Sequence, residues 1–148
     1  IDMYGDGDEI DNLRNLAKEC GIIDKVRFNH ATKKIHEVMR ENSVFVLTSE
    51  FEGMPNSLME AMGEGMTCVS TDCPCGGPRF LIENDVNGFL FPVGDEKKLS
   101  ILLDEILGNE TKRLMMAKRA ISIREKLNPE SIMIEWKHYI RSIVNGKY

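Results

Sequence analysis

Residues 43–71 read SVFVLTSEFEGMPNSLMEAMGEGMTCVST, and this stretch indicates the fold. Its first part, Ser43 to Thr48, is apolar enough to be a strand buried on both faces, and Thr67 to Thr71 is a second predicted strand. Between them, Asn56 to Met62 has the spacing of a helix, and Ser49 to Pro55 forms the loop before it. Strand, loop, helix and strand in this order indicate a βαβ unit of a parallel sheet.

Short apolar runs also alternate with amphipathic stretches before this unit. Ile1 to Tyr4 and Val26 to Phe28 are predicted strands. The helix between them should end at Gly21, and Thr32 should cap the next helix. We therefore expect an α/β fold, in which helices flank a Rossmann-like parallel sheet.

After the unit, Pro78 and Asp95 mark the first turns of two helices, with a short strand, Phe89 to Phe91, between them. From Glu96 the sequence is helical to its end, so we expect a helical appendix over about 96–148. Two turns should interrupt it, at Gly108-Asn109 and Asn128-Pro129. The apolar residues of the last helix cover more than one narrow face: Ile132, Ile134, Trp136, Tyr139, Ile140 and Ile143. Either a neighbour outside this chain covers them, or they are the exposed residues of an edge helix.

At 148 residues the chain is long enough for one compact domain, which we expect to span 1–148. It starts with neither an initiator Met nor a signal segment, so we expect it to lack the beginning of a longer protein. The net charge of -5 is spread along the chain and argues against a nucleic-acid partner. No apolar run approaches the ~20 residues that span a bilayer. Four unevenly spaced cysteines indicate free thiols in a cytoplasmic protein, not a disulfide framework or a zinc site.

Ligands of an open parallel sheet bind outside the carboxyl ends of its strands. Three loops occupy such positions: Gly5 to Gly7, Ser49 to Asn56 and Asp72 to Gly77. All are rich in Gly, Pro or small polar residues, which let a phosphate approach the amides at a helix N-terminus. The same residues also make tight turns, so for Gly5 and Gly7 both interpretations stay open.

Two carboxylates flank the start of the predicted central helix. Glu52 precedes it and Glu60 lies one turn inside it, with the backbone of Gly53 to Asn56 between them. Such a set suits a nucleoside diphosphate sugar, whose phosphates accept from amides and whose hydroxyls donate to carboxylates. However, Ser57, Glu60 and Glu64 also have the spacing of a solvated helix stripe, and spacing alone favours the stripe.

Several elements occur in the order and at the spacing of one enzyme family. They are Tyr4-Gly5-Asp6-Gly7, Val26-Arg27-Phe28, Thr48-Ser49, Glu52 to Glu60 with Ala61-Met62, Gly65, Ser70-Thr71-Asp72, Gly76-Gly77-Pro78-Arg79, Asn87-Gly88 and Asp95. On these elements the chain resembles the C-terminal half of glycosyltransferase family 4. These are retaining enzymes of the two-domain GT-B fold that use nucleotide-activated sugars. The resemblance implies a donor-binding domain from an enzyme that builds a polysaccharide or a similar glycan.

The resemblance also implies a set of donor-binding residues: Gly5, Gly7, His30, Glu52, Gly53, Met54, Pro55, Asn56 and Glu60. Glu52 would bind and position the donor sugar at the reacting centre without acting as a nucleophile. Glu60 would bind the ribose, and the base would lie near Asn29-His30. Because backbone amides between the two glutamates would neutralise the diphosphate, neither a metal ion nor a cofactor is expected.

Two departures from the family pattern have consequences. Phe80 stands where the family commonly has Glu, which removes either a polar contact near the donor or a charge at a helix N-terminus. The basic residues that such enzymes bring to the diphosphate, and the whole acceptor-binding domain, would lie before Ile1. A saccharide or lipid-linked acceptor would therefore bind through that other domain, and this chain alone would transfer nothing. Attachment to a membrane would be peripheral, at its inner face.

Two other functions stay open. One is a nucleotide-sugar epimerase of GT-B-like fold, and the other is a non-catalytic module for binding or assembly. The presence of both Glu52 and Glu60 argues against a degenerate module. A glycoside hydrolase is disfavoured because Glu60 lies toward the ribose and not across a scissile bond.

Overall fold

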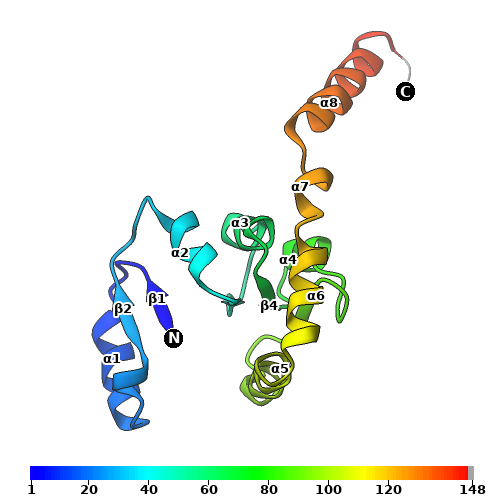
Figure 1. Cartoon of the computed structure of the whole chain (residues 1–148). Coiled ribbons are helices and arrows are strands. Elements are labelled where there is room, and N and C mark those ends of the chain that lie inside the picture. Colours follow the sequence, from blue (N-terminus) through cyan, green and yellow to red (C-terminus); the bar gives the residue numbers. More distant parts are fainter. Residues whose placement is uncertain (147–148) are drawn as a thin grey trace. The chain divides into compact units, whose positions relative to one another are not determined.

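Strands and helices alternate along the chain in a computed structural model that describes residues 1–146 (Figure 1). The chain divides into two compact units, Ile1–Ile35 and His36–Tyr148, each with its own strands. Every strand pair in both units is parallel. The single-domain organisation stays a prediction.

The first unit is a βαβ arrangement in which a helix connects two paired strands. Its elements are β1 (Asp2–Tyr4), α1 (Ile10–Glu19), the short 3-10 helix η1 (Ile23–Lys25) and β2 (Arg27–Asn29). Met3 pairs with Phe28 in the parallel register. Gly21 adopts a left-handed conformation with φ 66°, so the predicted helix end is confirmed.

The second unit contains a three-stranded sheet in the order β3 (Val44–Leu47), β4 (Thr67–Thr71) and β5 (Gly88–Phe91). All five residues of β4 are buried. The prediction that the first of these strands is buried on both faces is wrong, because β3 is half-buried and Val46 is 38% exposed. In the described part of this unit, residues 36–146, β3 pairs on one side only, with β4, so its other edge has no strand partner there.

The second unit also contains helices. They are α2 (Ile35–Glu41), α3 (Asn56–Glu64), α4 (Gly77–Leu81), α5 (Glu96–Gly108), α6 (Glu110–Ala120), α7 (Ile123–Lys126) and α8 (Pro129–Val144). Helix α3 contacts β3 and β4, while α5 and α6 pack on β4 and β5. The core of this packing consists of Val69, Phe89, Phe91, Leu102, Ile106 and Met116. At about 25 cal/mol per Å² of buried apolar surface, such a cluster is the main stabilising term of the unit.

Side chains cap the helices of the second unit at the predicted breaks. Asp95 accepts from the Lys98 amide at 2.9 Å, and Asn109 and Asn128 cap α6 and α8 in the same way. The sequence missed the break between α6 and α7. The predicted Thr32 cap is wrong, because α2 begins at Ile35 and Thr32 instead accepts from the Lys34 amide in a turn.

Helix α8 has no buried residue. Figure 1 shows it continuing from α7 away from the sheet of the same unit. Trp136 and Tyr139 contact each other edge to face, with ring centroids 6.0 Å apart, and both are about half exposed. Two explanations for the apolar residues of α8 therefore stay open: a neighbour outside this chain covers them, or they are the exposed residues of an edge helix. Over residues 1–146, no helix has the length and apolar character needed to cross a membrane.

Glu64 joins three helices of the second unit. Its carboxylate accepts from Arg40 of α2 at 2.7 Å and lies 3.2 Å from His36 and 3.9 Å from Arg124 of α7. Its side chain is only 12% exposed, so the prediction of a solvated stripe is wrong at this position. The hydrogen bond from Arg40 is the main reason that the pKa of Glu64 lies below its ordinary value.

The lowered pKa gives Glu64 a pH-dependent contribution to stability. The unfolded carboxyl, with an ordinary pKa of 4.5, binds its proton at a higher pH than the folded one. The ionised Glu64 carboxylate therefore stabilises the folded protein above pH 4.5, and this contribution is lost as the pH falls through the pKa of the folded protein. Glu64→Gln should lower the melting temperature by a few degrees near neutral pH, and the difference should shrink below pH ~4.

Thermal unfolding followed by circular dichroism across this pH range tests the effect. Glu41→Gln, at an exposed position of α2, is the matched control and should leave the melting temperature unchanged. A difference between Glu64→Gln and the unchanged protein that is the same at every pH would contradict the role of the ionised carboxylate.

Candidate donor site

Two loops of the second unit meet at the carboxyl edge of its sheet. One follows β3 and leads into α3, and the other follows β4 and leads into α4. The Glu52 amide donates to the Pro74 carbonyl at 2.8 Å and so joins the two loops. At Gly77 an added Cβ would lie 1.8 Å from the Gly53 carbonyl oxygen, so no side chain fits between them. This close approach fixes the loop that precedes α3.

The N-terminus of α3 presents backbone donors. The helix begins at Asn56, as predicted, and no side chain caps it at Pro55. Within residues 1–146, no hydrogen-bond acceptor is found for the amides of Gly53 and Met54 or for those of Asn56, Ser57 and Leu58, and the Met59 amide is the first that donates within the turn, to the Pro55 carbonyl. Gly53, Met54 and Asn56 are exposed, whereas Pro55 is buried. These donors and the positive end of the helix dipole create a place for an anion.

The two predicted carboxylates belong to this loop and helix. Glu52 is half-buried, and its Oε1 accepts from the Ser49 hydroxyl at 2.8 Å. Glu60 is also half-buried, and in the described part of the chain its carboxylate has neither a hydrogen bond nor an ion pair. Both glutamates therefore have oxygens available to accept hydrogen bonds from a ligand.

Three further residues of the predicted donor site, Gly5, Gly7 and His30, lie in the first unit. Asp6, between Gly5 and Gly7, bonds through one oxygen to His30 at 2.5 Å and through the other to the Ala31 amide. These bonds, that from His30 foremost, hold the pKa of Asp6 below its ordinary value. The structure thus brings the Gly5 to Gly7 turn and His30 together. Apart from the adjacent residues, no atom of residues 1–146 lies within 4 Å of a Cβ placed on either glycine, so a ligand can approach the backbone there.

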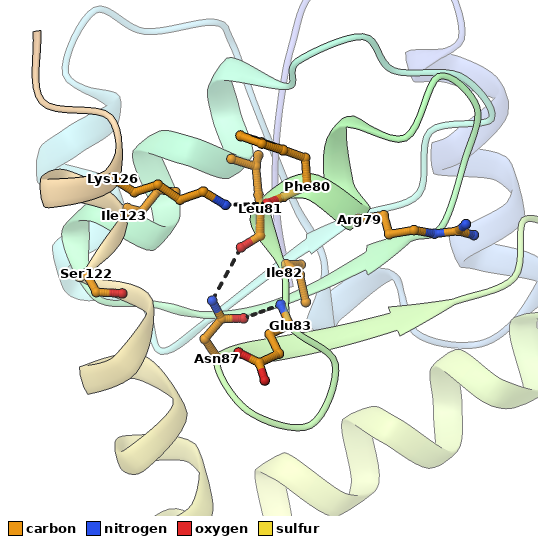
Figure 2. Close-up of a pocket in the computed structure, with 9 residues that line it drawn as sticks. All are labelled: Arg79, Phe80, Leu81, Ile82, Glu83, Asn87, Ser122, Ile123 and Lys126. Atoms are coloured by element: carbon orange, nitrogen blue, oxygen red, sulfur yellow. Dashed lines mark hydrogen bonds between the residues drawn. The ribbon is translucent and has the colours of Figure 1, made fainter. Parts of the chain in front are cut away.

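Phe80 lies at a separate cavity of about 470 Å³, shown in Figure 2. The Lys126 ammonium is 3.9 Å from the centre of its ring and donates to its carbonyl at 2.7 Å. The lining comes from α4, from the segment that leads to β5, and from the α6–α7 junction. None of the predicted donor-binding residues contributes to it. The neighbouring Arg79 forms an ion pair with Asp72 at the end of β4.

Sequence reasoning did not assign a role to Ser49, Thr71 or Gly77, although all three lie in the family-like elements. Ser49 bonds to Glu52, and Thr71 donates to the Ser49 carbonyl at 2.6 Å. The signal for Gly77 was the Gly-Gly-Pro run, because a double glycine before a helix indicates a close approach of backbone.

The cysteines and acidic groups form no metal centre in residues 1–146, where no cluster of three or more His, Cys, Asp or Glu side chains could hold an ion. All four cysteines are free, as predicted. Burial raises the pKa of Cys68 well above the usual range, so that thiol is unreactive. Metal-independence itself stays a prediction.

Comparison with known proteins identifies the family of the chain. The sequence model described as "Glycosyl transferases group 1" matches residues 1–123. The chain belongs to this family. It is 32% identical over 137 residues to a glycosyltransferase of Haemophilus influenzae, covering 93% of this chain and 38% of that protein. It is 31% identical to the lipopolysaccharide 1,6-galactosyltransferase of Escherichia coli K12, covering 74% of this chain and 32% of that enzyme.

The fold is also found in solved glycosyltransferase structures. The crystal structure of Anabaena HepE in complex with UDP superimposes with a TM-score of 0.89 at 22% identity, covering 95% of this chain and 40% of HepE. The predicted Rossmann-like α/β fold, the C-terminal half of a GT-B arrangement, is thereby confirmed. The chain spans about a third of the length of the curated relatives it matches.

The Gly77–Gly53 approach predicts that alanine cannot replace Gly77. The added Cβ would also lie 2.9 Å from Pro55, so the loop before α3 would have to move. We expect Gly77→Ala to lower the free energy of unfolding by about 1–3 kcal/mol. Nucleoside diphosphate binding should weaken as well.

Chemical denaturation measures the first effect and isothermal titration with UDP and GDP the second. Gly63→Ala in α3 is the matched control, since its Cβ would meet nothing closer than 3.8 Å. It should be neutral or stabilise by up to about 1 kcal/mol. Equal stability and affinity in Gly77→Ala and Gly63→Ala would show that the approach does not constrain the loop.

Proposed function

We propose that the protein containing this chain is a retaining glycosyltransferase. It transfers a sugar from a UDP- or GDP-linked donor to a saccharide or lipid-linked acceptor in glycan biosynthesis. The observation that carries this proposal is the uncapped N-terminus of α3, which lies beside the half-buried Glu52 carboxylate at the carboxyl edge of the sheet. The relatives support the class of reaction, since their names include lipopolysaccharide and amylovoran biosynthesis.

The amides of the loop before α3 bind the diphosphate in this proposal. Gly53 and Met54 are exposed and their amides have no acceptor in residues 1–146, so they can donate to phosphate oxygens without breaking another bond. The helix dipole adds to this attraction. When the nucleoside diphosphate leaves, negative charge grows on its phosphate, and donors already aimed at that charge lower the barrier without reorganisation. This stabilisation needs no metal ion or cofactor.

The two glutamates bind the hydroxyl groups of the donor. Glu52 accepts from hydroxyls of the transferred sugar and positions it at the reacting centre, and Glu60 accepts from the ribose. The turn of Gly5 and Gly7 and the exposed His30 contribute to binding the nucleotide. Acceptor binding belongs to the part of the protein outside this chain, and its association with the membrane is peripheral, at the inner face.

Incubation of the complete protein with a panel of donors tests the reaction class. UDP-glucose, UDP-galactose, UDP-N-acetylglucosamine and GDP-mannose are each supplied with lipid-linked and free saccharide acceptors. Release of UDP or GDP together with a product that retains the anomeric configuration is expected for one donor. A product that is only an epimer of the donor sugar would favour the epimerase, and no turnover with any donor would favour a binding module.

Glu60→Ala tests the ribose assignment in the same protein. Loss of hydrogen bonds to a charged group should weaken donor binding by about 10- to 100-fold in isothermal titration. The free nucleoside diphosphate should lose as much affinity as the donor, because both carry the ribose. Glu105→Ala, at a partly exposed position of α5, is a control that should bind as the unchanged protein does. Tight binding by Glu60→Ala would remove the ribose role.

A further inference from the structure

We propose that Ser49 is a positioning residue that holds the Glu52 carboxylate in the orientation needed for the donor sugar, and that Thr71 anchors Ser49. The proposal rests on the function proposed for Glu52. It concerns a residue pair that does not contact the donor itself. Its evidence is a pair of hydrogen bonds that leads from the buried strand β4 through Ser49 to the carboxylate, with a third bond that holds the Glu52 backbone.

The first bond fixes one oxygen of the carboxylate. Ser49 Oγ donates to Glu52 Oε1 at 2.8 Å, in a partly buried setting. The other oxygen, Oε2, has no partner in the described chain. Because an ionised carboxylate has about four acceptor positions, one bond from Ser49 leaves ample capacity for sugar hydroxyls. The bond therefore selects an orientation of the side chain without saturating it.

The second bond fixes Ser49. Thr71 Oγ1 donates to the Ser49 carbonyl at 2.6 Å. Thr71 is the last residue of β4 and is only 1% exposed, and its β-branched side chain has few rotamers. The loop after β3 is therefore attached to β4, the most buried strand of the unit, at Ser49, the residue whose hydroxyl bonds to Glu52.

The third bond fixes the backbone of Glu52. Its amide donates to the Pro74 carbonyl at 2.8 Å, in the loop after β4. Main chain and carboxylate are thus held from two sides, Pro74 on one and Ser49 on the other. A free glutamate side chain has to lose its rotamer freedom when it binds a ligand, whereas this one has lost much of it already. Pre-organisation of this kind benefits the step that needs accurate placement of the sugar.

The position of Ser49 makes a selective prediction about ligands. In the proposed site only the sugar of the donor binds Glu52, whereas the diphosphate binds the backbone amides of Gly53, Met54 and Asn56. Ser49→Ala should therefore weaken binding of a nucleotide sugar by roughly 10- to 100-fold and change the affinity of the free nucleotide by less than about 2-fold. A purely structural role of Ser49 would disturb the whole loop and weaken both ligands alike.

The experiment is isothermal titration of the complete protein with two matched pairs of ligands, UDP-glucose with UDP and GDP-mannose with GDP. The variants are Ser49→Ala, Ser49→Thr, which keeps the hydroxyl, Thr71→Val, which keeps the shape, and Glu52→Gln. Ser43→Ala, at the exposed start of the segment that forms β3, is the control. We expect sugar-selective losses in Ser49→Ala and Glu52→Gln, a smaller one in Thr71→Val, and near-normal binding in Ser49→Thr and the control.

The outcomes separate this proposal from the function on which it rests. If Glu52→Gln loses sugar-dependent affinity but Ser49→Ala and Thr71→Val do not, the positioning role is wrong and the donor site stands. Equal losses for sugar nucleotide and nucleotide in Ser49→Ala would also overturn it, in favour of a structural role. Unchanged binding in Glu52→Gln would overturn the assignment of Glu52 itself.

Discussion

The buried strand β4 is the constraint on which the second unit depends. Three of its five residues are polar, and a buried polar group without a partner costs about 1–3 kcal/mol. Each has a partner: Thr67 donates to the Arg113 carbonyl at 2.7 Å, Ser70 to that of Thr71 and Thr71 to that of Ser49. In residues 1–146 no buried side-chain nitrogen or oxygen is left unsatisfied. The hydrogen bonds that the polar side chains of β4 form therefore attach both α6 and the loop after β3 to the centre of the sheet.

That attachment explains how a short loop can present charges and donors in a fixed place. The loop before α3 is held by Thr71 through Ser49, by Pro74 through the Glu52 amide and by contact with Gly77. Its own amides are left over for a ligand. A loop with free donors is costly to keep ordered, and the buried strand supplies the rigidity that the loop lacks.

The sequence predicted the parts of the fold that depend on local signals. The apolar runs of β3 and β4, the start of α3 at Asn56 and the Asp95 cap could all be recognised because neighbouring residues determine them. Contacts between distant residues could not. Glu64 looked like a solvated carboxylate because Arg40 is 24 residues away along the chain. The half-exposure of β3 depends on which strand lacks a second partner, and an apolar pattern does not contain that information.

In the candidate site, too, local features could be predicted from the sequence and contacts between distant residues could not. Glu52, Glu60 and the loop between them could be predicted as site residues because motif and helix start coincide. The link from Ser49 to Thr71 could not, because it joins residues 22 positions apart in the sequence. The most direct measurement is a crystal structure of the complete protein with an intact UDP- or GDP-sugar. The account predicts that the diphosphate binds the amides of Gly53, Met54 and Asn56 and that a sugar hydroxyl binds Glu52. A donor bound elsewhere, for example in the cavity between Phe80 and Lys126, would contradict it.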